Sequence, residues 1–425
     1  MKRFSFRSLH VAASLSLLAA CQSNPSSNPE TSTPNAGASA LTPGTWRGVL
    51  AAQGQQIPFL FDVDIAGDEP VVTLRNGEER LLLDEIKTAG DSTTVRLGVF
   101  DAALVVRADG AGKLKGHWVK YDGKEPFRVP FTATKGEQPL FPATEKNASP
   151  EASGTWRVTF TDQDGKTYPA VGIFEQKAAD LAGTFLTTTG DYRYLAGNID
   201  GQQLRLSTFD GSHGFLFTAQ RQPDGTLKGD FYSGKSGHET WTAVQDPNAK
   251  LPDANSLTGL KPGQKRLDFK FPSVYEGGSI SPTDPKYKGK VVIVQVLGSW
   301  CPNCMDETNF LAPWYEKNKS RGVEIIGLGY ERTADQKVAA QKLLKMKERL
   351  RVGYDLAVAG QANKDAASQS LPQLKGVLAF PTTIFLDKKG EVRKVHTGFS
   401  GPGTGPYYQQ EIAEFNETVN KLLAE

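Results

Sequence analysis

Short stretches in which apolar and polar residues alternate fill the first half of the chain. Residues 58–63 and 204–209 are examples, and turn pairs such as Asp224-Gly225 separate these stretches. Alternation with a period of two is typical of strands with one buried face, and Asp-Gly pairs between them are typical of hairpins. No stretch of this half shows the spacing of a long amphipathic helix, so the pattern predicts antiparallel strands joined by hairpins.

The alternating stretches occur twice, with a period of about 110 residues. Gly-Thr-Trp-Arg at 44–47 returns at 154–157, and three further matches follow in the same order. We interpret residues 44–134 and 152–245 as duplicated β units that form a small barrel or sandwich, either separately or together. The repeated tryptophan is interpreted as a core residue, with a ligand platform as the alternative.

The hydrophobic pattern changes after residue 290. Residues 291–297 are almost all apolar and rich in β-branched side chains, which is typical of a strand buried on both faces. After the cysteine motif a helix is predicted through residues 305–307 to about residue 319, with Gly322 ending it, and a second strand over 323–330. This order of strand, helix and strand indicates a right-handed unit with parallel strands.

Further elements extend this α/β pattern to the end of the chain. We expect a lysine-rich helix that ends near residue 350 and is capped by Thr333. Two antiparallel strands are predicted over 382–387 and 392–396. The apolar face of a final helix is formed by Ile412, Phe415, Val419, Leu422 and Leu423. The predicted fold class is therefore multidomain, an α/β domain preceded by two antiparallel β units.

The first 20 residues have the pattern of a secretory signal peptide. Basic residues at the N-terminus precede a mostly apolar stretch over 9–20. Leu18-Ala19-Ala20-Cys21 then resembles the bacterial lipobox, in which the cysteine is lipidated and becomes the new N-terminus. An ordinary signal peptide with a chance cysteine is the alternative. We expect a periplasm-facing protein of the bacterial cell envelope that is anchored by lipid to the inner or the outer membrane.

Segments rich in Ser, Asn, Pro and Lys separate the patterned regions. The segment after Cys21 has too few apolar residues to bury a core, so we interpret it as a flexible tether. The predicted organisation is a signal peptide at 1–20, a lipidated cysteine and tether at 21–43, β units at 44–134 and 152–245, and an α/β domain at 266–425.

Charge and cysteine content narrow the functional classes. The 425 residues include 49 Lys and Arg against 47 Asp and Glu, so the net charge is +2 and a nucleic-acid partner is not expected. The three cysteines, Cys21, Cys301 and Cys304, exclude a disulfide-dense scaffold. The longest apolar stretch is too short to span a bilayer, which excludes a polytopic membrane protein.

Cys301 and Cys304 enclose a Pro-Asn dipeptide at the junction of a predicted strand and helix. Unpaired N–H groups and the helix dipole favour a thiolate at Cys301, which makes it the candidate nucleophile. Cys304 follows one turn later and is the candidate resolving cysteine. Half of a zinc site, a c-type haem attachment and a structural disulfide are the alternatives. The first lacks further ligands, and the second needs histidine where Met305 stands.

Phe380-Pro381 stands directly before the predicted strand over 382–387. In a chain with this cysteine pair, the proline suggests a cis peptide bond. The backbone of Phe380 would then lie beside the cysteines as a docking edge for an extended substrate. A proline that simply marks the start of a strand is the alternative.

The C-terminal region resembles the TlpA/ResA-like thioredoxin-fold family of bacterial envelope disulfide reductases. The resemblance covers under half of the chain and rests on residues 288–294, 299–304, Glu307 and 380–387. It implies a thioredoxin fold with an inserted helix and strand at about 333–375. It also implies Cys301 as nucleophile, Cys304 as resolving cysteine and Pro381 as the cis-proline.

The resemblance further implies that Glu307 tunes the thiols, whereas the alternative is a solvated acid of the first helical turn. Trp300, next to the cysteine motif, is included among the candidate site residues. Thioredoxin has a buried aspartate at the position of Gln295, and glutamine cannot take up a proton. Proton transfer would then depend on Glu307, on water or on no dedicated group.

Two further features carry no predicted chemistry. The glycine-rich segment 396–406 lacks the context of a phosphate loop and either lines the cysteine site or connects to the last helix. His117, His213 and His238 lack the spacing of metal ligands, so we interpret them as surface or hairpin residues.

These features together predict an envelope thiol–disulfide oxidoreductase that reduces protein disulfides and needs no cofactor or metal. Its expected partners are disulfide-bearing envelope proteins, a membrane-embedded thiol electron donor, and the membrane through the lipid anchor. One alternative is a peroxiredoxin-like peroxidase with antioxidant activity, although that motif has threonine where Gly298 stands. The other is a binding lipoprotein whose β units recognise a partner and whose redox domain is accessory.

Overall fold

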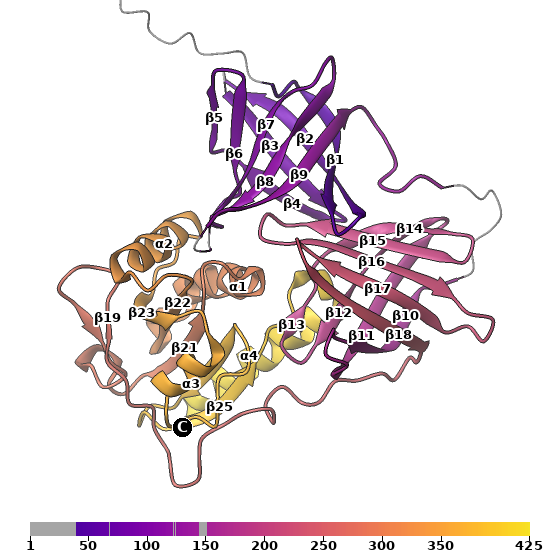
Figure 1. Cartoon of the computed structure of the whole chain (residues 1–425). Coiled ribbons are helices and arrows are strands. Elements are labelled where there is room, and N and C mark those ends of the chain that lie inside the picture. The colour runs from indigo at the N-terminus through magenta and orange to yellow at the C-terminus, as the bar shows by residue number, and fades with distance from the viewer. Residues whose placement is uncertain (1–39, 68, 122, 124, 144–150) are drawn as a thin grey trace, which may run out of the picture. The chain divides into compact units, whose positions relative to one another are not determined.

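Two antiparallel β sheets precede an α/β domain in the described part of the chain (Figure 1). The structure is a computed structural model, and it describes residues 40–67, 69–121, 123, 125–143 and 151–425. The predicted signal peptide, Cys21 and most of the predicted tether lie outside these residues. All described residues belong to one compact unit of the chain.

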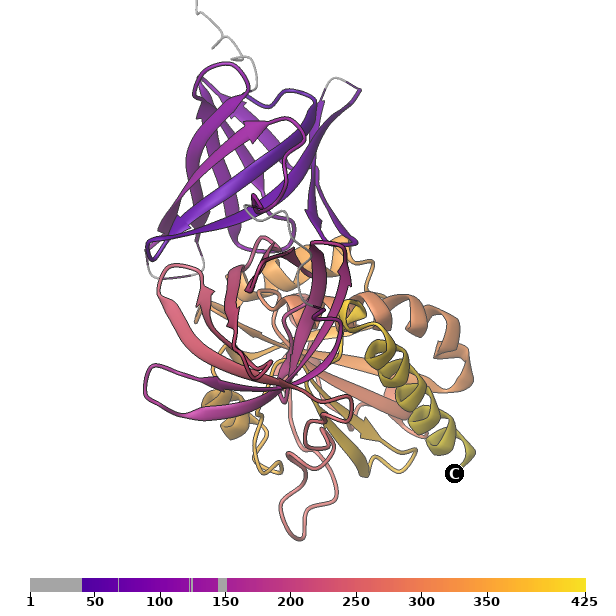
Figure 2. The ribbon, with the colours of Figure 1, turned by 90° about the vertical axis from the view of Figure 1, so that its right-hand side faces the viewer.

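The first β unit is a nine-stranded antiparallel sheet with the order β4-β3-β2-β1-β9-β8-β7-β6-β5. Its strands curve around a common interior (Figure 2). The first and last strands, β1 and β9, pair with each other in the middle of this order. The strands are β1 (Gly44–Ala52), β2 (Gln55–Ala66), β3 (Glu69–Asn76), β4 (Glu79–Leu83), β5 (Ile86–Ala89), β6 (Ser92–Arg96), β7 (Ala102–Ala108), β8 (Lys113–Lys120) and β9 (Phe127–Lys135).

The second β unit repeats this arrangement, with the order β11-β10-β18-β17-β16-β15-β14-β12-β13. Because β11 pairs with β12 as well as with β10, the sheet closes on itself. The strands are β10 (Gly154–Thr161), β11 (Thr167–Lys177), β12 (Asp180–Thr187), β13 (Gly190–Asp191), β14 (Leu195–Asp200), β15 (Gln203–Phe209), β16 (Gly214–Arg221), β17 (Leu227–Ser233) and β18 (Gly237–Gln245).

The repeated tryptophans occupy equivalent positions in the two units. Trp46 and Trp156 are both fully buried in the first strand of their sheet. Each indole N–H donates a hydrogen bond to the carbonyl oxygen four residues earlier, at Thr42 (3.0 Å) and Ala152 (2.9 Å). The predicted fold class of two duplicated β units is therefore confirmed, and the interpretation of the tryptophans as core residues holds for both.

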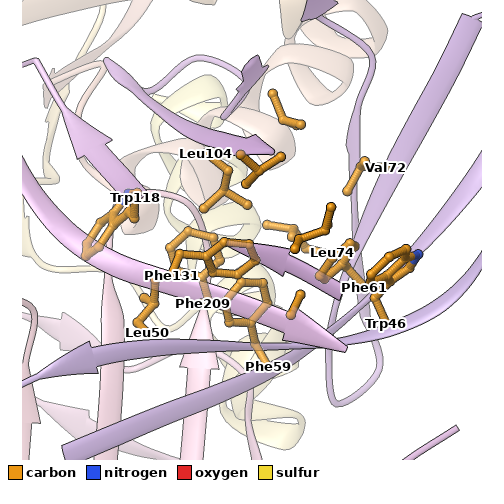
Figure 3. Close-up of a cluster of buried hydrophobic side chains, with 14 of the residues drawn as sticks. Trp46, Leu50, Phe59, Phe61, Val72, Leu74, Leu104, Trp118, Phe131 and Phe209 are labelled. Carbon is orange, nitrogen blue, oxygen red and sulfur yellow. The ribbon is translucent and has the colours of Figure 1, made fainter. Parts of the chain in front are cut away.

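The two β units also share a hydrophobic core. Phe209, at the end of β15, packs among the side chains of the first unit (Figure 3). Its ring centroid lies 4.4 Å from that of Phe59 and 5.4 Å from that of Trp118, within the range of favourable aromatic contacts. A side chain of the second unit thus completes the core of the first.

The ordered structure of the first unit begins earlier than predicted. Leu41, assigned to the flexible tether, is only 5% exposed and belongs to the same core. The backbone N–H of Ala40 donates to Thr93 Oγ1 (3.3 Å). Residues 40–43 therefore do not belong to a flexible tether, because packing against the sheet buries a leucine that the polar composition around it obscured.

The α/β domain is built on a five-stranded sheet with the order β23-β22-β21-β24-β25. The first three strands in this order are parallel, β24 runs antiparallel to β21, and β25 runs antiparallel to β24. This is the thioredoxin-like fold that the resemblance implied. The strands are β21 (Val291–Leu297), β22 (Val323–Glu331), β23 (Asp355–Gln361), β24 (Thr382–Leu386) and β25 (Val392–Thr397), and a small hairpin of β19 (Phe271–Pro272) and β20 (Ser279–Ile280) precedes them.

The helices of this domain follow the predicted pattern with one correction. They are α1 (Pro302–Asn318), α2 (Gln336–Arg349), α3 (Lys364–Ser370) and α4 (Pro406–Ala424), with short 3-10 turns at Pro285–Tyr287, Lys319–Arg321 and Pro402–Thr404. Asp335, not Thr333, caps α2, because its carboxylate accepts hydrogen bonds from the backbone of Lys337 and Val338. No helix in the described part of the chain is long and apolar enough to cross a membrane.

The shared core leads to a stability prediction. Phe209→Ala would leave a cavity between two fully buried rings, and such truncations cost roughly 3–5 kcal/mol. We expect the urea-unfolding transition of the first β unit, followed by tryptophan fluorescence, to lose stability of this size. As a control, Leu82→Ala removes a side chain that is 57% exposed and should change stability by less than about 0.5 kcal/mol. Equal effects of the two substitutions would contradict the shared core.

Candidate active site

Cys301 and Cys304 form a disulfide at the N-terminus of α1. Cys301 is the N-cap residue, Pro302 occupies the first helical turn, and Cys304 lies one turn into the helix. The Sγ atom of Cys301 accepts a hydrogen bond from the backbone N–H of Cys304 (3.2 Å). Cys301 is 5% exposed and Cys304 is completely buried. The arrangement therefore places the first sulfur at the helix end that stabilises negative charge.

The turn before Cys301 is held against the end of β22. The backbone N–H and the hydroxyl of Ser299 both donate to the carboxylate of Glu331 (2.8 Å each). The indole of Trp300 donates to the carbonyl oxygen of Tyr330 (2.8 Å). At Gly298 a Cβ would lie 2.2 Å from Nε1 of Trp300, so only glycine fits there. These contacts fix where the helix begins.

Phe380 and Pro381 lie beside the disulfide. The peptide bond between them is cis, and the carbonyl oxygen of Phe380 is 3.4 Å from Sγ of Cys301. The ring of Phe380 packs edge-on against that of Trp300, with centroids 5.6 Å apart. The structure thus brings together the two motifs that lie about 80 residues apart in the sequence.

Glu307 is buried behind the cysteines. It is 3% exposed, so the alternative of a solvated first-turn acid is wrong. Gln295 Nε2 donates to one carboxylate oxygen of Glu307 (2.7 Å), and the Thr383 hydroxyl donates to the other. Burial raises the pKa of Glu307 to about 7, although these two hydrogen bonds act in the opposite direction.

Gln295 holds this carboxylate in place. The side chain is fully buried in the middle of β21, and its carbonyl oxygen accepts a hydrogen bond from the hydroxyl of Tyr354 (3.0 Å). Its amide group also donates to Thr308 Oγ1 (3.1 Å). Because all these contacts suit an amide, the residue that replaces thioredoxin's aspartate orients Glu307 and carries no proton itself.

A histidine that the sequence did not single out lies near Glu307. A narrow cavity is bordered by Glu307, Thr383, His396 and Glu411, among others. His396 Nε2 lies 2.8 Å from a carboxylate oxygen of Glu411. Burial lowers the pKa of His396, but the hydrogen bond and charge of Glu411 outweigh burial and raise it overall. Titratable groups therefore extend from the buried carboxyl toward the last helix.

The second β unit also touches the cysteine motif, which no sequence feature indicated. Ser212 Oγ donates to the carbonyl oxygen of Trp300 (3.2 Å), and Asn303 Nδ2 donates to the carbonyl oxygen of Asp191 (3.2 Å). The glycine-rich segment joins this contact, because the N–H of Gly401 donates to Asp191 Oδ2 (2.7 Å). That segment therefore packs against the second β unit and does more than connect β25 to α4.

The three histidines of the β units lie in different surroundings. His213 borders a small cavity together with Asn303 of the cysteine motif. His238 pairs with Asp230 (2.9 Å), and His117 lies exposed on β8.

Comparison with known proteins finds a family model and relatives that resemble the C-terminal domain. Residues 261–412 match the family model described as Redoxin. The thiol-disulfide oxidoreductase ResA of Geobacillus thermodenitrificans is 30% identical over 141 residues, which are 33% of this chain and 72% of that protein. The chain belongs to the ResA family.

Two other relatives are similar to part of the chain. ResA of Bacillus thuringiensis subsp. konkukian is 32% identical over 117 residues, or 28% of this chain, which spans 59% of that relative's length. The thiol:disulfide interchange protein DsbE of Escherichia coli is 25% identical over 181 residues, which are 42% of this chain and 86% of that protein. The region of the Redoxin match does not include the β units.

The burial of Glu307 in this ResA-family domain predicts a pH dependence of stability. Its carboxyl holds a proton more tightly in the folded chain than in the unfolded chain, where the pKa is near 4.5. The folded state therefore loses stability as pH rises from about 4.5 to 7, by up to about 3 kcal/mol. Glu307→Gln should remove this loss, so the variant gains stability over the native protein at pH 8 and not at pH 4.5.

The measurement is urea unfolding of the oxidised protein at both pH values. Glu417→Gln, on the exposed side of α4, serves as the control and should leave the difference between pH 4.5 and pH 8 unchanged. A Glu307→Gln variant with the same pH dependence as the native protein would show that this carboxyl does not titrate in the predicted range.

Proposed function

We propose that the protein is a thiol–disulfide oxidoreductase that reduces disulfides of other proteins in the bacterial envelope. The observation that carries this proposal is the Cys301–Cys304 pair, bonded at a helix N-terminus and adjacent to the Phe380–Pro381 peptide. Membership of the ResA family, whose relatives are named thiol-disulfide oxidoreductases, supports the same chemistry.

In the proposed reaction the thiolate of reduced Cys301 attacks one sulfur of a substrate disulfide. A bond forms between Cys301 Sγ and that sulfur, the substrate S–S bond breaks, and the departing substrate sulfur takes up a proton. Cys304 then loses its proton and attacks Cys301 Sγ, which releases the second substrate sulfur as a thiol. The substrate gains two electrons and two protons, and the Cys301–Cys304 disulfide remains on the protein.

Glu307 is the proposed acceptor of the Cys304 proton. Residues three positions apart on a helix are neighbours, so Cys304 and Glu307 share one face of α1. A carboxyl with a pKa of about 7 is well matched to accept a proton near neutral pH, whereas Gln295 cannot accept one. His396 and Glu411, across the narrow cavity, would pass the proton toward solvent.

Substrate docking is assigned to the edge formed by Phe380 and Pro381. The carbonyl oxygen of Phe380 next to Cys301 suits a hydrogen bond from the backbone of an extended substrate. The ring of Trp300 flanks this edge and stacks on the guanidinium of Arg332, whose centre is 4.5 Å from the ring centroid. A substrate disulfide held along this edge would lie within reach of Cys301.

The envelope location rests on the sequence pattern at the N-terminus. A signal peptide at 1–20 and lipidation of Cys21 would anchor the protein to a membrane and leave its domains facing the periplasm. After each turnover the Cys301–Cys304 disulfide needs two electrons from another dithiol. We propose that a membrane-embedded thiol donor supplies them.

The peroxidase alternative loses support at Gly298. The peroxiredoxin motif needs threonine at this position, but even a Cβ atom there would meet the indole of Trp300 and lie 2.8 Å from the carbonyl oxygen of Tyr330. A hydroxyl beside Cys301 could not be accommodated without moving the end of β22.

The assignment of the two cysteines predicts a trapped intermediate. In Cys304→Ser the mixed disulfide through Cys301 cannot be resolved, so adducts with substrate proteins should accumulate. Non-reducing electrophoresis of envelope extracts, followed by mass spectrometry, would detect them. Cys301→Ser is the matched control and should trap none. A folded Cys304→Ser protein without adducts would contradict these roles.

The direction of electron flow predicts a reduction potential. A protein that reduces disulfides should have a Cys301–Cys304 potential at or below about −220 mV, toward the roughly −270 mV of thioredoxin. Equilibration with glutathione redox buffers and thiol alkylation would measure it. A potential near about −120 mV would instead indicate a disulfide donor and reverse the proposed direction.

A further inference from the structure

Two loops of the second β unit lie directly on the cysteine motif. We call residues 190–193 and 210–213 together the cover. Three residues of the motif are bonded to it. Ser212 donates to the carbonyl of Trp300, Arg193 Nη1 donates to the carbonyl of Pro302 (3.1 Å), and Asn303 donates to the carbonyl of Asp191. The cover thus follows the motif on both sides of Cys301.

Arg193 is the centre of this contact. Its side chain is 8% exposed and forms ion pairs with Asp306 of α1 and with Glu79 of the first β unit. Asp210 of the cover lies 3.8 Å from its Nε atom, which has no hydrogen-bond partner. A buried guanidinium is tolerated only among carboxylates, and these three come from three separate parts of the chain. The position of Arg193 therefore depends on the packing of all three parts.

Glycines allow the close approach. Gly190 has φ +141, and a Cβ at this position would lie 3.0 Å from the amide nitrogen of Asn303. On the opposite side a Cβ at Gly403 would lie 2.9 Å from the backbone of Arg193. A larger residue at either position would push the cover away from the motif.

The cover leaves little room above the motif. Cys301 is almost fully buried, and the space beside Asn303 is a small cavity bordered by Thr189, Tyr192, His213 and Phe215, among others. A flat protein surface cannot approach the motif from this side. At the other edge of the motif, Phe380 and Trp300 are only half-buried.

We propose that the second β unit restricts Cys301 to thin substrates, namely small disulfides and disulfides in extended segments, and that Arg193 is the positioning residue that keeps the cover closed. This inference rests on the proposed function for its substrates. The β units then determine which disulfides the redox domain accepts. A cover that serves as a docking platform for folded proteins is the opposite outcome, and the same experiment detects it.

The test compares two alkylating probes on the reduced full-length chain. Iodoacetamide is small, and a polyethylene-glycol maleimide is bulky; peptide mapping assigns the rates to Cys301. Arg193→Met removes the charge and every donor while keeping a long side chain. For each chain we compare the alkylation rate of Cys301 with the bulky probe to its rate with the small probe. We expect this ratio to rise roughly tenfold or more in Arg193→Met. Losing a buried ion pair costs more than the 1.4 kcal/mol that corresponds to a tenfold change.

Arg205→Met is the matched control. Arg205 belongs to the same β unit and pairs with Asp200 (3.4 Å). It also contacts Asn198, the carbonyl of Pro142 and the ring of Phe141, none of which belongs to the cover. The ratio of the two alkylation rates in Arg205→Met should equal the ratio in the native chain. Arg193→Lys keeps a charge and should restore most of the native ratio.

A second variant covers the case in which Arg193→Met does not fold. Ser212→Ala removes one hydrogen bond to the motif without leaving a buried charge, and should raise the ratio in the same direction by about two- to tenfold. Unchanged ratios in the folded variants would overturn the proposal. A ratio that falls would mean that the cover assists bulky partners, which also overturns it.

Activity assays separate this inference from the proposed function. We expect Arg193→Met to lower the KM for insulin disulfides by a larger factor than the KM for 2-hydroxyethyl disulfide. If the native protein reduces neither disulfide, the proposed function fails. The alkylation ratio still decides whether the cover restricts access, because it requires only a free thiol at Cys301.

Discussion

A buried positive charge needs carboxylates around it, and those around Arg193 come from both β units and from the α/β domain. Glu79 comes from the first β unit, Asp210 from the second and Asp306 from α1. Taking a guanidinium out of water costs several kcal/mol unless such partners are in place. The position of the cover on Pro302 therefore depends on all three parts being folded, and the redox motif shares that dependence.

A second buried polar group, the carboxyl of Glu307, lies close to the cysteine motif in the sequence and has a raised pKa. Glu307 keeps its carboxyl out of water because Gln295 and Thr383 satisfy it with hydrogen bonds. Burial raises its pKa to about 7, which an exposed residue at the same position of the helix would not have. An amide on β21 thus holds in place the carboxyl whose pKa is raised.

The duplicated β units share the same core positions but differ in the contacts that they make with the rest of the chain. Trp46 and Trp156 make the same hydrogen bond and fill the same place in each core. One end of the second unit makes further contacts, however. Phe209, the last residue of β15, directs its side chain into the core of the first unit, and the turn that follows it brings Ser212 into contact with the cysteine motif. The second unit therefore contacts the redox motif directly, in addition to packing against the first unit.

The sequence by itself determined the elements and the position of the Cys301–Cys304 pair at the start of a helix. Period-two alternation, an all-apolar strand and a cysteine at a helix start are local features, because neighbouring residues alone create them. The boundary at Leu41 and the cap of α2 were misjudged, since burial and side-chain geometry decided them. The contacts of Arg193, Glu331 and His396 were decided only by the tertiary structure. Each joins segments far apart in the chain, and the free energy of burying a charge or polar group exists only when those segments meet.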